Sequence, residues 1–92
     1  MFLLEYDLVD NYIERRAEFR NEHLGLATEA AQRGQLVLGG ALADRPDRAL
    51  LVWRVADRTV IDDFVRADPY VINGLVRSWS IRPWNVVVGT AS

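Results

Sequence analysis

The 92-residue chain contains no cysteine and no lysine, one methionine (Met1) and one histidine (His23). These absences exclude a cysteine nucleophile, a lysine Schiff base and any cysteine-based metal site. A catalytic zinc is not expected either, because one histidine with dispersed carboxylates does not supply three protein ligands. None of the three serines, Ser78, Ser80 and Ser92, sits in a nucleophile-elbow pattern. Histidine is the residue type whose unperturbed pKa suits proton transfer near neutral pH, so His23 is the leading candidate.

The charge of the chain argues against a nucleic-acid partner. All 11 basic residues are arginines spread along the chain, and the formal net charge is −2, whereas nucleic-acid binders are normally basic on one face. No apolar run approaches the roughly 20 residues of a membrane span. The first residues reach an acid, Glu5, without a basic segment, so we expect no secretory signal, no membrane partner and a cytoplasmic location.

The length predicts one domain over residues 1–92, because single domains typically span ~50 to ~200 residues. Asp10 and Asp57 are expected to cap helices, which Gly34 and the Asp68-Pro69 pair would end. Alternating apolar residues predict strands, and a period of 3.6 predicts helices. We expect strands over 2–8, 35–42, 49–55 and 79–88, helices over 11–33 and 59–67, and a short turn over 70–76.

The order of these elements, βαββαβ, predicts an α+β fold of the ferredoxin-like type. Such a fold has a four-stranded antiparallel sheet with both helices on one face. The other face carries too many apolar residues to be left in water. We therefore expect a second copy to stack its sheet there, forming a homodimer.

The helical pattern places His23 on the inward side of the first helix. At about 100° per residue, the glutamates share one arc, whereas His23, Arg16 and Arg20 fall among the apolar residues of the other. One interpretation is a core histidine satisfied by a hydrogen bond, with long arginine stems that reach past the core to water. The other is a polar pocket for an anionic ligand, because arginine is rarely buried without a partner.

Two later segments carry side chains of interest. Asp68, directly before Pro69, is either a turn residue or a carboxylate that orients the imidazole of His23. Trp79 and its neighbours are either core and interface residues or the aromatic wall of a pocket for a flat ring. Spacing alone does not show that these groups meet in space.

Together these motifs resemble the YciI (YCII-related) family, within the dimeric α+β barrel group of ferredoxin-like folds. The resemblance implies a homodimer, a cleft near the helices, and a paired histidine and aspartate, here His23 and Asp68, as active site. It also implies lyase-like elimination or isomerase-like steps on small cyclic compounds. It covers nearly the whole chain and is carried by Arg16, His23-Leu24, Gly34-Gln35-Leu36-Val37-Leu38-Gly39-Gly40, Asp68-Pro69-Tyr70, Gly74-Leu75 and Trp79-Ser80-Ile81-Arg82-Pro83-Trp84.

The leading hypothesis is a cofactor-independent enzyme in which His23 is the general acid–base and Asp68 holds it. No phosphate loop or dinucleotide fingerprint argues for a cofactor. The alternative is a dimeric module that binds a small acid or serves a partner without turnover; a cofactor-free oxygenase is a weaker option. The residues expected to bind a small anionic or aromatic substrate are Arg16, Arg20, Tyr70, Trp79 and Arg82.

Overall fold

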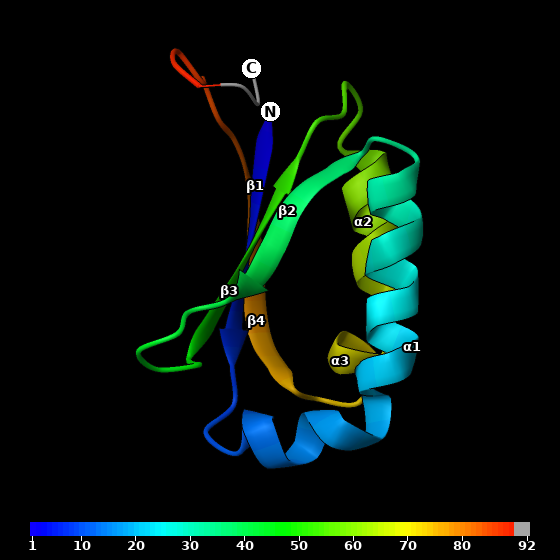
Figure 1. Ribbon diagram of the computed structural model, residues 1–92, viewed down its shortest axis with the longest axis vertical. Coiled ribbons are helices and arrows are strands. Elements are labelled where there is room, and N and C mark those ends of the chain that lie inside the picture. Colours follow the sequence, from blue (N-terminus) through cyan, green and yellow to red (C-terminus); the bar gives the residue numbers. More distant parts are fainter. Residues whose placement is uncertain (90–92) are drawn as a thin grey trace.

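A four-stranded antiparallel sheet with helices on one face makes up the fold (Figure 1). The computed structural model describes residues 1–89, and the strand order is β2-β3-β1-β4. The predicted ferredoxin-like α+β class is therefore confirmed. Within the described residues, none of the helices is long and apolar enough to cross a membrane. The elements are β1 (Phe2–Leu8), α1 (Tyr12–Gln32), β2 (Leu36–Ala41), β3 (Arg48–Trp53), α2 (Thr59–Ala67), α3 (Pro69–Ile72) and β4 (Val76–Pro83).

The alternation of β1 decides which side chains enter the core. Leu4, Tyr6 and Leu8 are buried, whereas the residues between them point to the opposite face of the sheet. Residues directly opposite in an antiparallel pair share a face, so the partners of Leu4 also face the helices. These partners are Leu51 on β3 and Ile81 on β4, and both are buried.

The first helix begins one residue later than expected. The prediction that Asp10 caps α1 is wrong: Asn11 occupies the capping position, without a side-chain hydrogen bond, and the Asp10 carboxylate lies 3.7 Å from the Arg77 guanidinium. The predicted end is confirmed, since Gly34 follows the helix with φ +76°, a conformation that glycine adopts without a steric penalty. Figure 1 shows α1 bending in its first third, so that its first turns run below the sheet and helices.

Asp68 lies at the junction of α2 and α3. It is extended (φ −69°, ψ 117°) because Pro69 disfavours a helical conformation in the residue before it, so α2 ends there as predicted. Pro69 then starts α3, which needs no backbone N–H at its first position. Gly74, with φ +78°, turns the chain from α3 toward β4.

The last strand differs most from its predicted limits. It runs over Val76–Pro83 rather than 79–88, and it forms an edge of the sheet, as Pro83 suggested. It starts early because an edge strand tolerates the polar, exposed residues that follow Val76. It ends at Pro83, which lies opposite Phe2, the first residue of β1. One more backbone hydrogen bond follows, from the Trp84 N–H to the Met1 carbonyl at 2.9 Å.

Candidate active site

His23 and Asp68, 45 residues apart in sequence, meet between α1 and the α2–α3 junction. His23 Nδ1 lies 2.7 Å from Asp68 Oδ1. The His23 side chain is 14% exposed and that of Asp68 is 0% exposed. A carboxylate can only accept, so Nδ1 carries the proton and donates it, which leaves the lone pair of the neutral imidazole on Nε2. The hydrogen bond thus assigns the tautomer in which Nε2 can act as a base.

The Asp68 carboxylate is buried but fully hydrogen-bonded. Besides His23, it accepts the Tyr70 backbone N–H at Oδ1 (3.0 Å) and the Tyr6 hydroxyl at Oδ2 (2.7 Å). Burial raises the pKa of Tyr6 well above its usual value, and the negative charge of Asp68 raises it further, so the phenol keeps its proton and donates. Three donors offset the cost of removing this charge from water.

Tyr6 was not among the residues predicted for the site. It lies on β1, far in sequence from Asp68 and outside the first helix and the 67–84 segment that hold the predicted site residues. One signal could have identified it. A tyrosine at an inward-facing position of a central strand needs a partner for its hydroxyl, and few polar groups are inward-facing in this chain.

A cavity of about 180 Å³ opens in front of His23. Four of the predicted site residues line it, namely His23, Arg16, Arg20 and Tyr70. Asp68 is not part of the wall, but it hydrogen-bonds to His23 and to two other lining residues. The rest of its wall comes from β1, β2, β3 and two further residues of α1. These residues are Tyr6, Leu8, Tyr12, Leu24, Gly39, Gly40, Ala41, Ala49 and Leu51.

The ring of Tyr70 covers one face of the imidazole. The two rings are parallel within 8°, with centroids 3.8 Å apart, and Tyr12 meets the Tyr70 ring edge-on at 5.7 Å. Tyr70 is 2% exposed, and its hydroxyl has no hydrogen-bond partner among residues 1–89. Burial raises the pKa of Tyr70 to about 12, an effect that Tyr12 reinforces and the Arg20 and Arg16 charges oppose. The phenol is thus protonated at neutral pH and can donate a hydrogen bond.

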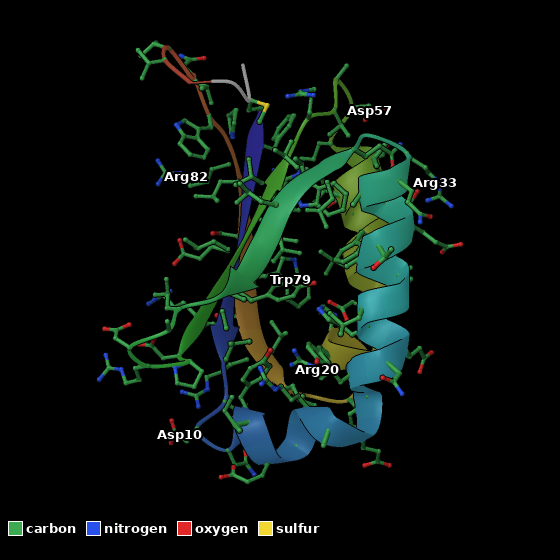
Figure 2. All side chains as sticks on the ribbon, viewed as in Figure 1. Asp10, Arg20, Arg33, Asp57, Trp79 and Arg82 are labelled. Carbon is green, nitrogen blue, oxygen red and sulfur yellow. The ribbon has the colours of Figure 1, made fainter. Side chains whose placement is uncertain are left out.

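Arg16 and Arg20 bring two positive charges to the cavity. Neither forms an ion pair with a carboxylate of the part of the chain that the structure describes. The Arg16 guanidinium lies 5.4 Å from the centroid of the Tyr12 ring. In Figure 2, Arg20 lies on the side of α1 that faces the sheet. Two unpaired guanidinium groups beside one cavity favour an anionic ligand.

The structure does not bring the other two predicted residues to this cavity. Trp79 lies opposite Tyr6, on the inner face, but at the edge of the sheet, where it is 48% exposed. Arg82 lies opposite Leu3, which places it on the outer face, and Figure 2 shows it on the side away from the helices. Successive residues of a strand point to opposite faces of the sheet. Trp79, two residues before Ile81, therefore shares its inner face, whereas Arg82, directly after Ile81, points to the outer face.

The sequence matches the model of the YCII-related domain over residues 1–85. The chain belongs to the YCII-related family. A solved structure of similar fold is the 5-chloro-2-hydroxyhydroquinone dehydrochlorinase TftG from Burkholderia phenoliruptrix AC1100, in complex with 2,5-dihydroxybenzoquinone. It superposes with a TM-score of 0.77 and 16% sequence identity over 91% of this chain and 92% of that chain. No curated protein sequence matches the chain.

The cavity of this YCII-related protein combines one base, two cations and one hydrogen-bond donor. The base is Nε2 of His23, the cations are Arg16 and Arg20, and the donor is the Tyr70 hydroxyl. Within residues 1–89, no three histidine or carboxylate side chains come together as metal ligands would. The arrangement is suited to taking a proton from an anionic or acidic molecule and returning it.

Proposed function

We propose that this YCII-related protein is a cofactor-independent enzyme that transfers a proton on a small cyclic, anionic substrate, with His23 as general acid–base. The observation that carries the proposal is the 2.7 Å hydrogen bond from His23 Nδ1 to the buried Asp68 carboxylate. It fixes the tautomer and orientation of the ring and stabilises the imidazolium that forms when Nε2 accepts a proton. The reaction class is elimination or isomerisation.

Each reaction needs only the groups that line the cavity. In an elimination, Nε2 takes a proton from the substrate, the electrons of that bond form a double bond, and the leaving group departs with its own electron pair. In an isomerisation, the imidazolium returns the same proton at a different atom. Negative charge builds on a substrate oxygen in both, and Arg16 and Arg20 would stabilise it. No electrons are gained or lost, so neither reaction requires a redox cofactor.

The cavity volume supports a substrate with a single ring. A cavity of about 150 Å³ accommodates benzene, and the cavity here measures about 180 Å³. The neighbour TftG is named for a dehydrochlorination and binds a dihydroxylated single-ring quinone, which agrees in size and in reaction class. A ring with one or two anionic oxygens would place those oxygens near the guanidinium groups, and the Tyr70 hydroxyl would donate to one of them.

Ligand binding without turnover is the alternative that the same site allows. The cations and the Tyr70 hydroxyl account for binding of an anion without any role for Nε2. In that case His23 is a structural partner of Asp68 and loses its chemical role. The two functions make different predictions for a histidine variant, because binding depends on the arginines and turnover depends on the imidazole.

We also propose that two copies associate through the outer face of the sheet. Leu3, Leu38 and Val52 lie side by side there on three neighbouring strands, and Leu50 lies next to them on β3. Leu38 is exposed in the single chain. Light scattering after size exclusion should give twice the chain mass, and Leu38→Arg should shift the protein to the monomer.

The enzymatic proposal is tested with His23→Ala. Wild-type protein is incubated with single-ring hydroxyhydroquinones, including 5-chloro-2-hydroxyhydroquinone, and product is followed by absorbance and chloride release. We expect His23→Ala to lower kcat/KM by about 10²- to 10⁴-fold, the usual contribution of a general acid–base. Glu22→Ala, an exposed neighbour on α1 outside the cavity wall, should match wild type. Unchanged kcat/KM in His23→Ala would exclude the proposed role.

A wild-type protein that binds 2,5-dihydroxybenzoquinone but converts none of these compounds would favour the binding module instead. Binding is measured by calorimetry in parallel with the activity assay. In that outcome His23→Ala should retain affinity for the quinone, since the cations that hold the anion are unchanged.

A further inference from the structure

The Tyr6–Asp68 hydrogen bond joins the sheet to the histidine pair. Tyr6 Oη lies 2.7 Å from Asp68 Oδ2, and both residues are almost completely buried. We infer that Tyr6 is a positioning residue that holds Asp68, and through it the imidazole of His23, in the geometry and charge state that proton transfer requires. This inference rests on the proposed acid–base role of His23.

The two carboxylate oxygens of Asp68 have separate donors. Oδ1 accepts from His23 and from the Tyr70 backbone, whereas the Tyr6 hydroxyl is the donor to Oδ2 within the described residues. Without Tyr6, Oδ2 would be a buried charged oxygen with no hydrogen-bond donor among residues 1–89. Tyr6 therefore supports the negative charge that the imidazole uses.

The position of Tyr6 makes it a rigid support. It lies in the middle of β1, a central strand paired with β3 on one side and β4 on the other. His23 and Asp68 come from the helical layer. The hydrogen bond thus fixes the helix-borne pair against the sheet, and a hydroxyl on a central strand moves less than one on a loop.

The sign of the effect on His23 follows from charge. When His23 is neutral, Asp68 carries an unshared negative charge, and the hydrogen bond from Tyr6 is strongest. When His23 is protonated, the imidazolium shares that charge and the Tyr6 bond weakens. Tyr6 therefore favours the neutral, proton-accepting form of the pair, and its removal should make His23 easier to protonate.

The other titratable side chains facing His23 leave this sign unchanged. Arg16, Arg20 and Tyr12 face the cavity from α1, and Tyr70 faces it from α3, while β2 and β3 contribute no titratable side chain to its wall. None of these groups changes in a Tyr6 variant. The difference between variant and wild type thus reports the Tyr6 hydroxyl alone.

The test is an NMR titration of the imidazole. His23 is the only histidine, so its C2 proton gives a single histidine signal without assignment. Tyr6→Phe keeps the ring in the core and removes the hydroxyl. We expect the titration midpoint of this signal to rise by about half a unit to one pH unit, a fraction of a charge-assisted hydrogen bond. Tyr12→Phe, the same change at a ring without a hydrogen bond to Asp68, should leave the midpoint in place.

A second variant tests the opposite direction and covers the case in which Tyr6→Phe does not fold. 3-Fluorotyrosine in place of Tyr6 retains the hydroxyl as a stronger donor and should lower the midpoint. A purely structural role for Tyr6 would reduce thermal stability and leave the midpoint unchanged in both proteins. That result, or a shift with the opposite sign, would overturn the inference.

Failure of the proposed function would look different. Full activity of His23→Ala would remove the acid–base role and leave the titration results intact. If the titration midpoint were the same in wild type and the Tyr6 variants, and turnover still required His23, only the proposed role of Tyr6 would be excluded.

Discussion

Two aspartates near helix starts each accept the backbone N–H of the residue two positions later, but only one of them is buried. The prediction that Asp57 caps α2 is off by one residue, since Arg58 occupies the capping position, whereas Asp68 does cap α3. The Thr59 backbone N–H donates to Asp57 Oδ1 at 2.9 Å, and the Tyr70 backbone N–H donates to Asp68 Oδ1 at 3.0 Å. Asp57 lies on the surface at one end of the molecule (Figure 2), whereas Asp68 lies in the core. Water surrounds the first carboxylate, and protein donors surround the second.

The comparison shows that tertiary position gives the second aspartate its additional contacts. Asp57 needs only its bond from the Thr59 N–H, because its side chain is exposed to solvent. Asp68 is 0% exposed, so bulk solvent does not hydrate its charge, and the side chains of His23 and Tyr6 each donate to one of its oxygens. The burial that makes the carboxylate costly also strengthens its influence on the imidazole.

Replacing each aspartate with alanine should produce the largest difference between them, in the free energy of unfolding of the protein. Asp68→Ala leaves the Tyr6 hydroxyl, the His23 Nδ1–H and the Tyr70 N–H without their acceptor. We expect the free energy of unfolding to fall by about 3–5 kcal/mol, the usual result of removing one partner of a buried polar cluster. Urea unfolding followed by tryptophan fluorescence measures it.

Asp57→Ala is the matched control for this measurement. It removes one exposed hydrogen bond at the start of α2, so the decrease in the free energy of unfolding should be clearly smaller. Equal losses in the two variants would contradict the comparison, because they would mean that the contacts to His23 and Tyr6 add nothing to the cap.

The sequence predicted the fold well because the fold depends on local patterns. The alternation in Phe2–Leu8 and the Asp68-Pro69 stop both appear in the structure as expected. The cap assigned to Asp10 failed because an aspartate near a helix start has several possible partners, and here the nearest charged one is Arg77 from β4. Such a choice depends on tertiary contacts that spacing does not record.

The site was less accessible to sequence reasoning. The helical arc brought His23, Arg16 and Arg20 to one side, and the structure places all three at one cavity. Arg15 donates to the Asn73 carbonyl at 2.6 Å and joins α1 to the turn after α3, a contact that helical periodicity does not predict. Tyr6 was missed because its partner is 62 residues away. Local periodicity predicts which face a residue occupies, but the partner on that face depends on topology.

A second comparison is between the cavity arginines, Arg16 and Arg20, and Arg58 beside Asp57. The effect expected here, on ligand affinity, is intermediate in size. Arg58, next to Asp57, has the Asp62 carboxylate at 3.8 Å, whereas Arg16 and Arg20 have no carboxylate partner within residues 1–89. We expect Arg16→Gln and Arg20→Gln each to weaken binding of 2,5-dihydroxybenzoquinone or benzoate about tenfold, roughly 1.4 kcal/mol. Calorimetric titration gives the Kd values.

Arg58→Gln is the control for this experiment, since it removes the same charge away from the cavity. Its Kd should equal that of wild type. If all three variants weaken binding equally, the attraction comes from net charge, and the cavity arginines make no specific contact with the ligand.

The smallest expected effect is the pH dependence of the surface cap. The backbone hydrogen bond from Thr59 holds the pKa of Asp57 below its usual value. A carboxylate with a lowered folded-state pKa stabilises the protein at pH values above the unfolded pKa of about 3.9, and this contribution is lost as the pH falls through the folded value. Asp57→Asn keeps a capping oxygen that does not titrate. The stability difference between wild type and Asp57→Asn, measured by urea unfolding at several pH values, should therefore be small at pH 7 and should decrease toward zero or change sign under acid conditions. A difference that stays constant with pH would mean that the charge of Asp57 contributes nothing beyond its hydrogen bond.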